Sequence, residues 1–148
     1  MVPGTAYFRN AEIIMNMNDA LAACRSQSVI PRVLHVDADN TTALILATLL
    51  MPEIRVTRVA TAADATASLA EHRYDLIVLD ADLPDGCGQA LIDAHRERGC
   101  HTPVLLYSAC QPSLHHQAHA YLPKPWTSPR QLWQSICRLL ELDMMGAR

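Results

Sequence analysis

Short apolar segments and longer amphipathic segments alternate along the chain from residue 32 onward. The apolar segments are typical of strands, and they cover residues 32–36, 55–60, 75–80, 103–107 and 120–122. The third of them contains Leu-Ile-Val-Leu without interruption, as expected for a central strand covered on both faces. Such alternation of strand-like and helix-like segments is typical of βα repeats, which build a parallel sheet.

Capping residues mark where the intervening helices begin. Residues 39–42 are Asp-Asn-Thr-Thr, good N-cap types, and they precede a helix that Pro52 closes. Thr61 is placed to cap an alanine-rich helix that extends to Glu71. A third helix is predicted over residues 88–98, after a turn.

The final helix is equally well marked, but the segment before it is short. Ser128 is a capping residue with Pro129 at the first helical position, and apolar residues follow at helical spacing. Only 13 residues separate Tyr107 from Tyr121. This interval has little room for a loop, a full helix and another loop. We therefore expect the fourth helix to be shortened to a turn or two around residues 114–119, or absent.

Residues 1–31 differ from the rest of the chain. The pattern predicts an amphipathic helix that packs on the domain or on a second copy, with disorder as the alternative. Two such apolar stripes packed across a twofold axis would form a homodimer through residues 9–25. We divide the chain into an N-terminal extension (1–31), one domain (32–143) and a tail (144–148). The stripe consists of Ile13, Met17, Ala20, Leu21 and Cys24.

The composition of the chain argues against several classes of protein. The 148 residues suffice for one domain with a core, and the net charge of −3 without a basic stripe argues against direct nucleic-acid binding. No apolar stretch is long enough to cross a membrane and no secretory signal is evident, so we expect a cytoplasmic protein that does not bind membranes. The five cysteines are odd in number and lack CxxC spacing, which favours reduced thiols over disulfides or structural zinc.

Polar residues with related chemistry follow four of the apolar runs. The runs end in Asp37, Asp80, Ser108 and Lys124: two carboxylates, a hydroxyl and an ammonium. In an open parallel sheet, ligand chemistry gathers at the carboxyl ends of the strands. We therefore expect these four side chains to converge in one pocket, where they are suited to bind a phosphate or its metal.

These motifs together resemble the receiver domain of bacterial two-component response regulators. The resemblance covers about residues 32–142 and implies a flavodoxin-like α/β fold. That fold is a doubly wound, five-stranded parallel sheet with helices on both faces. The matching motifs are Val36-Asp37, Val78-Leu79-Asp80 followed by Leu83-Pro84-Asp85-Gly86, Ser108-Ala109, and Tyr121-Leu122-Pro123-Lys124-Pro125.

The resemblance implies a role for each residue of the site. Asp80 matches the phosphoacceptor that takes a phosphoryl group from a histidine kinase or phosphotransfer protein. Ser108 and Lys124 match the hydroxyl and the ammonium that bind the phosphoryl oxygens. Tyr121 matches the aromatic residue whose rotamer follows the switch. The bond between Lys124 and Pro125 is cis in this family.

The resemblance also implies a Mg²⁺ site, but this chain lacks one of the acidic residues that the family usually has there. Its ligands would be Asp37, Asp80 and the backbone carbonyl of Asp82, with Asp39 as an additional candidate that equally suits a helix cap. Ala38 stands where the family usually has a second acid, and alanine has no ligand atom. The Asp82 side chain would either replace that ligand or repel the incoming phosphate. We therefore expect weak Mg²⁺ binding.

Two readings of function remain open from the sequence. The first is signal relay, not enzymatic turnover, in which phosphorylation of Asp80 is read by a downstream protein or a missing output domain. The second is a pseudo-receiver, a protein-interaction module that does not depend on phosphate.

Histidines outside the motifs have weaker interpretations. His115 and His119 would share a helix face beside His116, and such a pair is a zinc ligand in some proteins, but a solvated loop is the commoner case. His35, within the first strand, is expected to be a core side chain with its hydrogen bonds satisfied.

Overall fold

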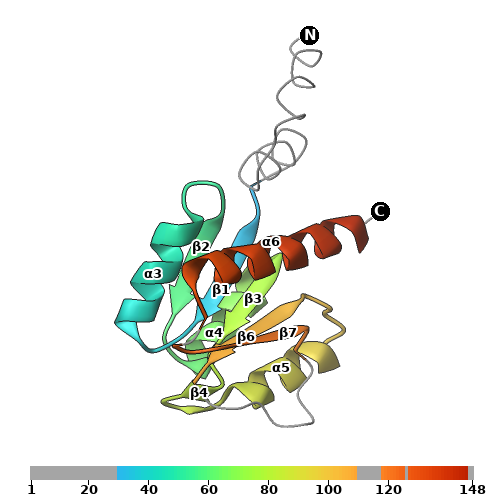
Figure 1. Cartoon of the computed structure of the whole chain (residues 1–148). Helices are drawn as coiled ribbons and strands as arrows, with labels where there is room; N and C mark the ends of the chain where they lie inside the picture. Colours follow the sequence, from blue (N-terminus) through green and yellow to red (C-terminus); the bar gives the residue numbers. More distant parts are fainter. Residues whose placement is uncertain (1–29, 110–117, 126, 147–148) are drawn as a thin grey trace.

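The computed structural model of the protein describes residues 30–109, 118–125 and 127–146. These residues contain a five-stranded sheet of order β2-β1-β3-β6-β7, in which every neighbouring pair is parallel (Figure 1). This is the strand order of flavodoxin-like folds, so the predicted fold class is confirmed. The strands are β1 (Arg32–Val36), β2 (Arg55–Val59), β3 (Leu76–Leu79), β6 (Val104–Ser108) and β7 (Ala120–Pro123).

Two pairs of helices cover the two faces of the sheet (Figure 1). Alternate residues of β1 enter the two cores: Val33 packs on the α3 and α6 side, and Leu34 on the α4 and α5 side. Because β3 is covered on both faces, its four residues are all apolar and buried. The helices are α3 (Asn40–Leu50), α4 (Ala62–Glu71), α5 (Gly88–Glu97) and α6 (Pro129–Gly146).

The capping residues predicted from the sequence begin three of these helices. Asp39 caps α3 by accepting a hydrogen bond from the backbone N–H of Thr41 at 3.2 Å. Thr61 caps α4 by accepting one from Asp64 at 3.1 Å. Before α6, Ser128 and Gln131 bond each other's backbone N–H groups reciprocally, at 3.2 Å and 2.9 Å, which is a capping box.

The turn predicted at residues 83–86 belongs to a small antiparallel hairpin. Its strands are β4 (Asp82–Leu83) and β5 (Gly86–Cys87). Gly86 has a φ of +147°, a conformation that residues with a side chain rarely adopt. The carboxylate of Asp85 accepts hydrogen bonds from the N–H groups of Ala62 at 2.8 Å and Ala63 at 2.9 Å. The loop after β3 is thereby tied to the start of α4.

Some expectations lie outside the described residues. These are the amphipathic helix in the N-terminal extension and, apart from residues 118–119, the shortened fourth helix at 114–119. Helix α6 continues to Gly146, beyond residue 143, where we expected the domain to end. The helices that the structure describes include none that is both long and apolar enough to cross a membrane.

Candidate functional site

Four strands bring the predicted strand-end residues to one edge of the sheet. Ser108 Oγ donates a hydrogen bond to Asp80 Oδ1 at 2.8 Å. Lys124 Nζ donates to Asp37 Oδ2 at 2.6 Å and to Asp80 Oδ2 at 3.3 Å. The four side chains meet although they are far apart in the sequence, because the carboxyl ends of the parallel neighbours β1, β3, β6 and β7 share this edge.

Asp37 is buried, yet its surroundings favour the charged carboxylate. Its side chain is 0 % exposed, and Oδ1 accepts a hydrogen bond from the backbone N–H of Asp39 at 2.9 Å. Burial alone would raise the pKa of Asp37, but His35, Lys124 and the Asp39 N–H together lower the pKa from 3.8 to about 2. The carboxylate therefore stays ionised near neutral pH and holds Lys124 in place.

Lys124 is the only lysine in the chain. Burial alone would lower the pKa of Lys124, but the carboxylates of Asp37 and then Asp80 outweigh it and raise the pKa above 10.5. The ammonium also lies 5.4 Å from the centre of the Tyr107 ring, within cation–π range. A fixed positive charge in this position stabilises negative charge on any group that joins Asp80.

Asp80 is the carboxylate that solvent reaches. Its side chain is 15 % exposed, against 0 % for Asp37. Oδ1 also accepts a hydrogen bond from the backbone N–H of Asp82 at 3.1 Å. A Cβ at Gly88 would lie 3.0 Å from the carbonyl oxygen of Asp80, so the absence of a side chain there lets α5 begin close to the site.

The acidic residues around the site have different roles. Asp39 uses Oδ1 in its cap, and Oδ2 accepts a hydrogen bond from Thr42 Oγ1 at 2.6 Å. The Thr42 contact is the main cause that lowers the pKa of Asp39. Ala38 is exposed beside Asp37 and offers no ligand atom, and the Asp82 side chain is exposed. The predicted capping role of Asp39 is confirmed, and its carboxylate is already used there.

Tyr121 is connected to the site through one residue. Its hydroxyl donates to the carbonyl oxygen of Ser108 at 3.4 Å, and the backbone N–H of Lys124 donates to the same carbonyl at 3.1 Å. The peptide bond between Lys124 and Pro125 is cis, as the family resemblance implied. Ser108 therefore contacts Asp80 with its side chain and Tyr121 with its backbone.

Two residues of the site were missed by sequence reasoning. Arg58 donates from Nε to the carbonyl oxygen of Asp37 at 2.9 Å, and Tyr107 lies against Lys124. The position of Arg58 depends on the register of β2 against β1, which no local pattern reveals. Tyr107 had a signal, since it lies in an apolar strand directly before Ser108.

The expectation for His35 was wrong in one respect. The side chain is buried in the core, as predicted, but neither ring nitrogen has a hydrogen-bond partner among the described residues. Nε2 lies 3.6 Å from Asp37 Oδ2, beyond hydrogen-bond distance. The ring is held by packing in β1 and by its proximity to the carboxylate.

The donor set of the site fits Mg²⁺. Two carboxylates, Asp37 and Asp80, offer hard oxygen ligands, which Mg²⁺ prefers. No group of three or more His, Cys, Asp or Glu side chains that could hold a metal exists in the part of the chain described. Because Mg²⁺ keeps several waters and needs only one or two carboxylates, this sparse set is compatible with it.

The histidine group is only partly described. His115 and His116 lie outside the described residues. His119 accepts a hydrogen bond at Nδ1 from the backbone N–H of Val104 at 3.1 Å, so this nitrogen is bound to the start of β6. The zinc interpretation of this group stays a prediction.

Comparison with known proteins agrees with the geometry. The sequence model described as "Response regulator receiver domain" matches residues 33–136, well over half of the chain. A search of curated proteins finds no match.

Solved structures show the same fold. A CheY-like response regulator receiver domain protein from Methanospirillum hungatei is 26 % identical, with a TM-score of 0.70, covering 79 % of this chain and 98 % of its own. The receiver domain of Francisella response regulator 1452 is 26 % identical, with a TM-score of 0.68 and coverages of 76 % and 98 %. The signal receiver domain of an HD domain-containing protein from Pseudomonas fluorescens is 25 % identical, with a TM-score of 0.70 and coverages of 78 % and 98 %.

Proposed function

Because the chain belongs to the response regulator receiver domain family, we propose that Asp80 accepts a phosphoryl group from a sensor histidine kinase or a phosphotransfer protein. The observation that carries this proposal is the pair of contacts on the Asp80 carboxylate. Ser108 Oγ bonds one oxygen and Lys124 Nζ approaches the other. Receiver domains are signalling modules, so the transfer is a relay step and not enzymatic turnover.

The transfer forms one bond and breaks one. A carboxylate oxygen of Asp80 attacks phosphorus, and the bond from phosphorus to the imidazole nitrogen of the donor phosphohistidine breaks, so neutral imidazole is released after protonation. Lys124 neutralises the phosphoryl oxygens, and Ser108 Oγ turns from the Asp80 carboxylate to donate to one of them. Bound Mg²⁺ would add positive charge to the same oxygens, held by Asp37, Asp80 and the Asp82 carbonyl.

Ser108 would connect phosphorylation of Asp80 to the conformation of Tyr121. When its hydroxyl moves to the phosphoryl group, its carbonyl contact with Tyr121 changes with it. Tyr121 is half-buried on β7, next to the surface that a downstream protein or an output domain would read. The switch is a two-state equilibrium that phosphorylation biases.

The outer face of α3 suits the docking of the phosphodonor. Leu44, Ile45 and Met51 are 68 %, 44 % and 58 % exposed, and α3 carries no charged residue. The helix begins beside Asp37, so a donor helix packed here would bring its phosphohistidine toward Asp80. Leu44→Glu should slow transfer from a phosphorylated donor protein while leaving phosphorylation by acetyl phosphate unchanged.

Acetyl phosphate with Mg²⁺ provides the direct test. The wild-type chain should gain one phosphoryl group, measured by intact mass, and Asp80→Asn should gain none. Asp64→Asn, at an exposed position in the first turn of α4, serves as the matched control and should be labelled like the wild type. Labelling of the Asp80→Asn variant at the wild-type level would refute the assignment.

A pseudo-receiver is the second candidate function, and one observation favours it. Ala38 leaves the metal site with Asp37 alone directly after β1, and Lys124 is already bound to Asp37 at 2.6 Å. Beryllofluoride with Mg²⁺ discriminates the two. A phosphate-controlled receiver should show chemical-shift changes at Ser108 and Tyr121, whereas a pseudo-receiver should show none.

The homodimer predicted through residues 9–25 is part of the same proposal. Deleting residues 1–28 should shift the protein toward monomer in sedimentation experiments while the domain stays folded. A truncated chain that remains dimeric at low concentration would contradict this assembly, as would a full-length chain that is monomeric throughout.

A further inference from the structure

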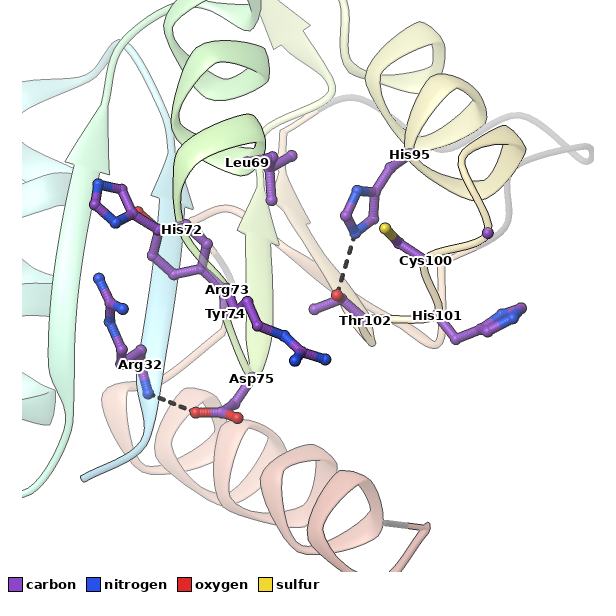
Figure 2. A pocket seen from close by; sticks show the side chains of 11 residues that line it. Arg32, Leu69, His72, Arg73, Tyr74, Asp75, His95, Cys100, His101 and Thr102 are labelled. Carbon is purple, nitrogen blue, oxygen red and sulfur yellow. Dashed lines mark hydrogen bonds between the residues drawn. The ribbon is translucent and has the colours of Figure 1, made fainter. Parts of the chain in front are cut away.

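A polar cavity lies at the opposite edge of the sheet from Asp80. It has a volume of about 730 Å³ and opens between the C-terminal ends of α4 and α5 (Figure 2). Its walls include Arg32 at the start of β1, Tyr74 just before β3, and Thr102 just before β6. The cavity is therefore formed at the amino ends of the strands, and it shares no residue with the site at their carboxyl ends.

The charged side chains of this cavity are mostly cationic and poorly paired. Arg32 and Arg73 line it together with a single acid, Asp75. Oδ2 of Asp75 accepts a hydrogen bond from the backbone N–H of Arg32 at 2.8 Å, and the described residues include no ion pair between Asp75 and either guanidinium. The ion pairs of Lys124 lie at the other edge.

Arg32 and Arg73 present their charge in different ways. The Arg32 guanidinium lies 5.3 Å from the centre of the Tyr74 ring, and its buried Nε has no hydrogen-bond partner among the described residues. Arg73 is exposed at the rim, and its guanidinium points toward the Asp75 and Thr102 side of the cavity, away from His72 (Figure 2). An anion at the rim would meet the charge of Arg73 without displacing an ion pair of the described residues.

His95 supplies a buried polar atom without a partner. Its side chain is 6 % exposed, and Nε2 shares a hydrogen bond of 3.1 Å with Thr102 Oγ1. Nδ1 is buried and has no partner among the described residues. Burial, and then the charges of Arg96 and Arg98, lower the pKa of His95, so the ring is neutral at pH 7. His95 and Thr102 therefore form a hydrogen-bonded part of the cavity wall.

The cavity also has an apolar patch. Leu69 points from α4 into the space between the Tyr74 side and the His95 side (Figure 2). The volume of the cavity lies within the usual range of small-molecule sites. This combination favours a ligand with a compact apolar body and one anionic group.

We propose that this cavity binds a small organic anion, a carboxylate or a phosphate monoester carried on a ring or a short apolar body. The anionic group lies at Arg73, and the body lies against Leu69 and Tyr74. The site does not depend on phosphorylation of Asp80, so it stands whether or not the proposed function does.

Four probe molecules test the two halves of this recognition separately. Benzoate and phenyl phosphate have a ring and an anionic group, inorganic phosphate has only the charge, and benzyl alcohol has only the ring. In titrations followed by amide chemical shifts, benzoate or phenyl phosphate should bind at millimolar concentration and shift Tyr74 and Thr102. Inorganic phosphate and benzyl alcohol should each bind at least about tenfold more weakly.

Variants locate the binding. Arg73→Gln should weaken benzoate or phenyl phosphate about tenfold, because one charge-assisted contact is lost. Arg55→Gln is the matched control: Arg55 is exposed at the amino end of β2 but does not line the cavity. Asp80→Asn should leave both affinities unchanged, which separates this site from the phosphoacceptor.

Cys100 offers a local chemical readout. It is a free, half-buried cysteine in the cavity wall, near His95 (Figure 2). Bound benzoate or phenyl phosphate should slow alkylation of Cys100 by iodoacetamide, measured by peptide mass. The proposal fails if no probe shifts Tyr74 or Thr102. It also fails if Arg73→Gln and Arg55→Gln weaken binding equally, or if the shifts appear at Ser108 and Lys124 alone.

Discussion

Among the described residues, charged side chains are paired at the carboxyl edge of the sheet, where the strands end, and unpaired at the amino edge, where the strands begin. At the carboxyl edge, Lys124 bridges two carboxylates at 2.6 and 3.3 Å, and each of these carboxylates accepts further hydrogen bonds. At the amino edge, Arg32 and Arg73 have no ion pair within the described chain. Paired buried charges are held in one geometry before any ligand arrives, which suits them to stabilise a transferring group. Unpaired charges at a cavity rim gain most of their stabilisation from a ligand.

Removing the central cation should have the largest effect. Lys124→Met leaves the buried carboxylate of Asp37 without its ammonium, and such a loss costs about 3 kcal/mol of folding free energy. It also removes charge stabilisation from the acceptor, so phosphorylation by acetyl phosphate should slow about 100-fold. Urea denaturation and intact-mass kinetics measure the two effects.

Arg130→Met, at an exposed position of α6, is the matched control for that substitution. It should change stability and phosphorylation rate little. Equal losses in the two variants would show that Lys124 acts as an ordinary surface cation.

Lowering the pH should reduce the free energy of unfolding, because Asp37 becomes protonated. Because its pKa is lowered from 3.8 to about 2 in the folded state, its contribution is complete above pH 3.8 and is lost as the pH falls through 2. The loss should be about 2 kcal/mol, in the presence of a chelator. Denaturation at several pH values between 5 and 2 measures it, and Asp37→Asn should flatten the curve. A wild-type curve as flat as that of the variant would contradict the ion-pair geometry.

Adding an acid at the same edge should strengthen metal binding. Ala38→Asp places a carboxylate beside Asp37 at an exposed position, and one added charged ligand should tighten Mg²⁺ binding about tenfold, or about 1.4 kcal/mol. Calorimetric titration of Mg²⁺ measures the change, with Ala38→Asn as the uncharged control. Unchanged or weaker binding in Ala38→Asp would mean that Asp39 or Asp82 already supplies the ligand.

The smallest effect is expected at the amino edge. Arg73→Gln removes a positive charge, as Lys124→Met does, but Arg73 is exposed and has no ion pair among the described residues. Stability should therefore change by less than about 0.5 kcal/mol. Thermal and urea denaturation without added anions measure it. If Arg73→Gln lost as much stability as Lys124→Met, the paired and unpaired cations would not differ in their contribution to folding.

Much of the carboxyl edge could be predicted because its polar residues directly follow apolar strands that can be recognised in the sequence. The apolar runs before Asp37 and Asp80 determine that both strands are buried, and parallel packing then determines that their ends meet. The capping roles of Asp39, Thr61 and Ser128 follow from local hydrogen bonding, which depends on residues only a few positions apart.

Other features were decided by the tertiary structure alone. The contact of Arg58 with the Asp37 carbonyl depends on strand register, and the cap that Asp85 places on α4 spans two elements. The unsatisfied ring of His35 follows from what packs around it, which strand periodicity does not specify.

The two edges therefore differ in how far the sequence by itself determines them. For the carboxyl edge, the sequence determined the elements, their order and the residue types that meet at Asp80, because strand and helix periodicity are local properties of the chain. Only the tertiary structure decided that Lys124 would bind Asp37 more closely than Asp80, and that Arg73 and His95 would face one cavity. Those distances arise from the packing of helix ends and loops, where the chain has no repeating pattern to constrain them.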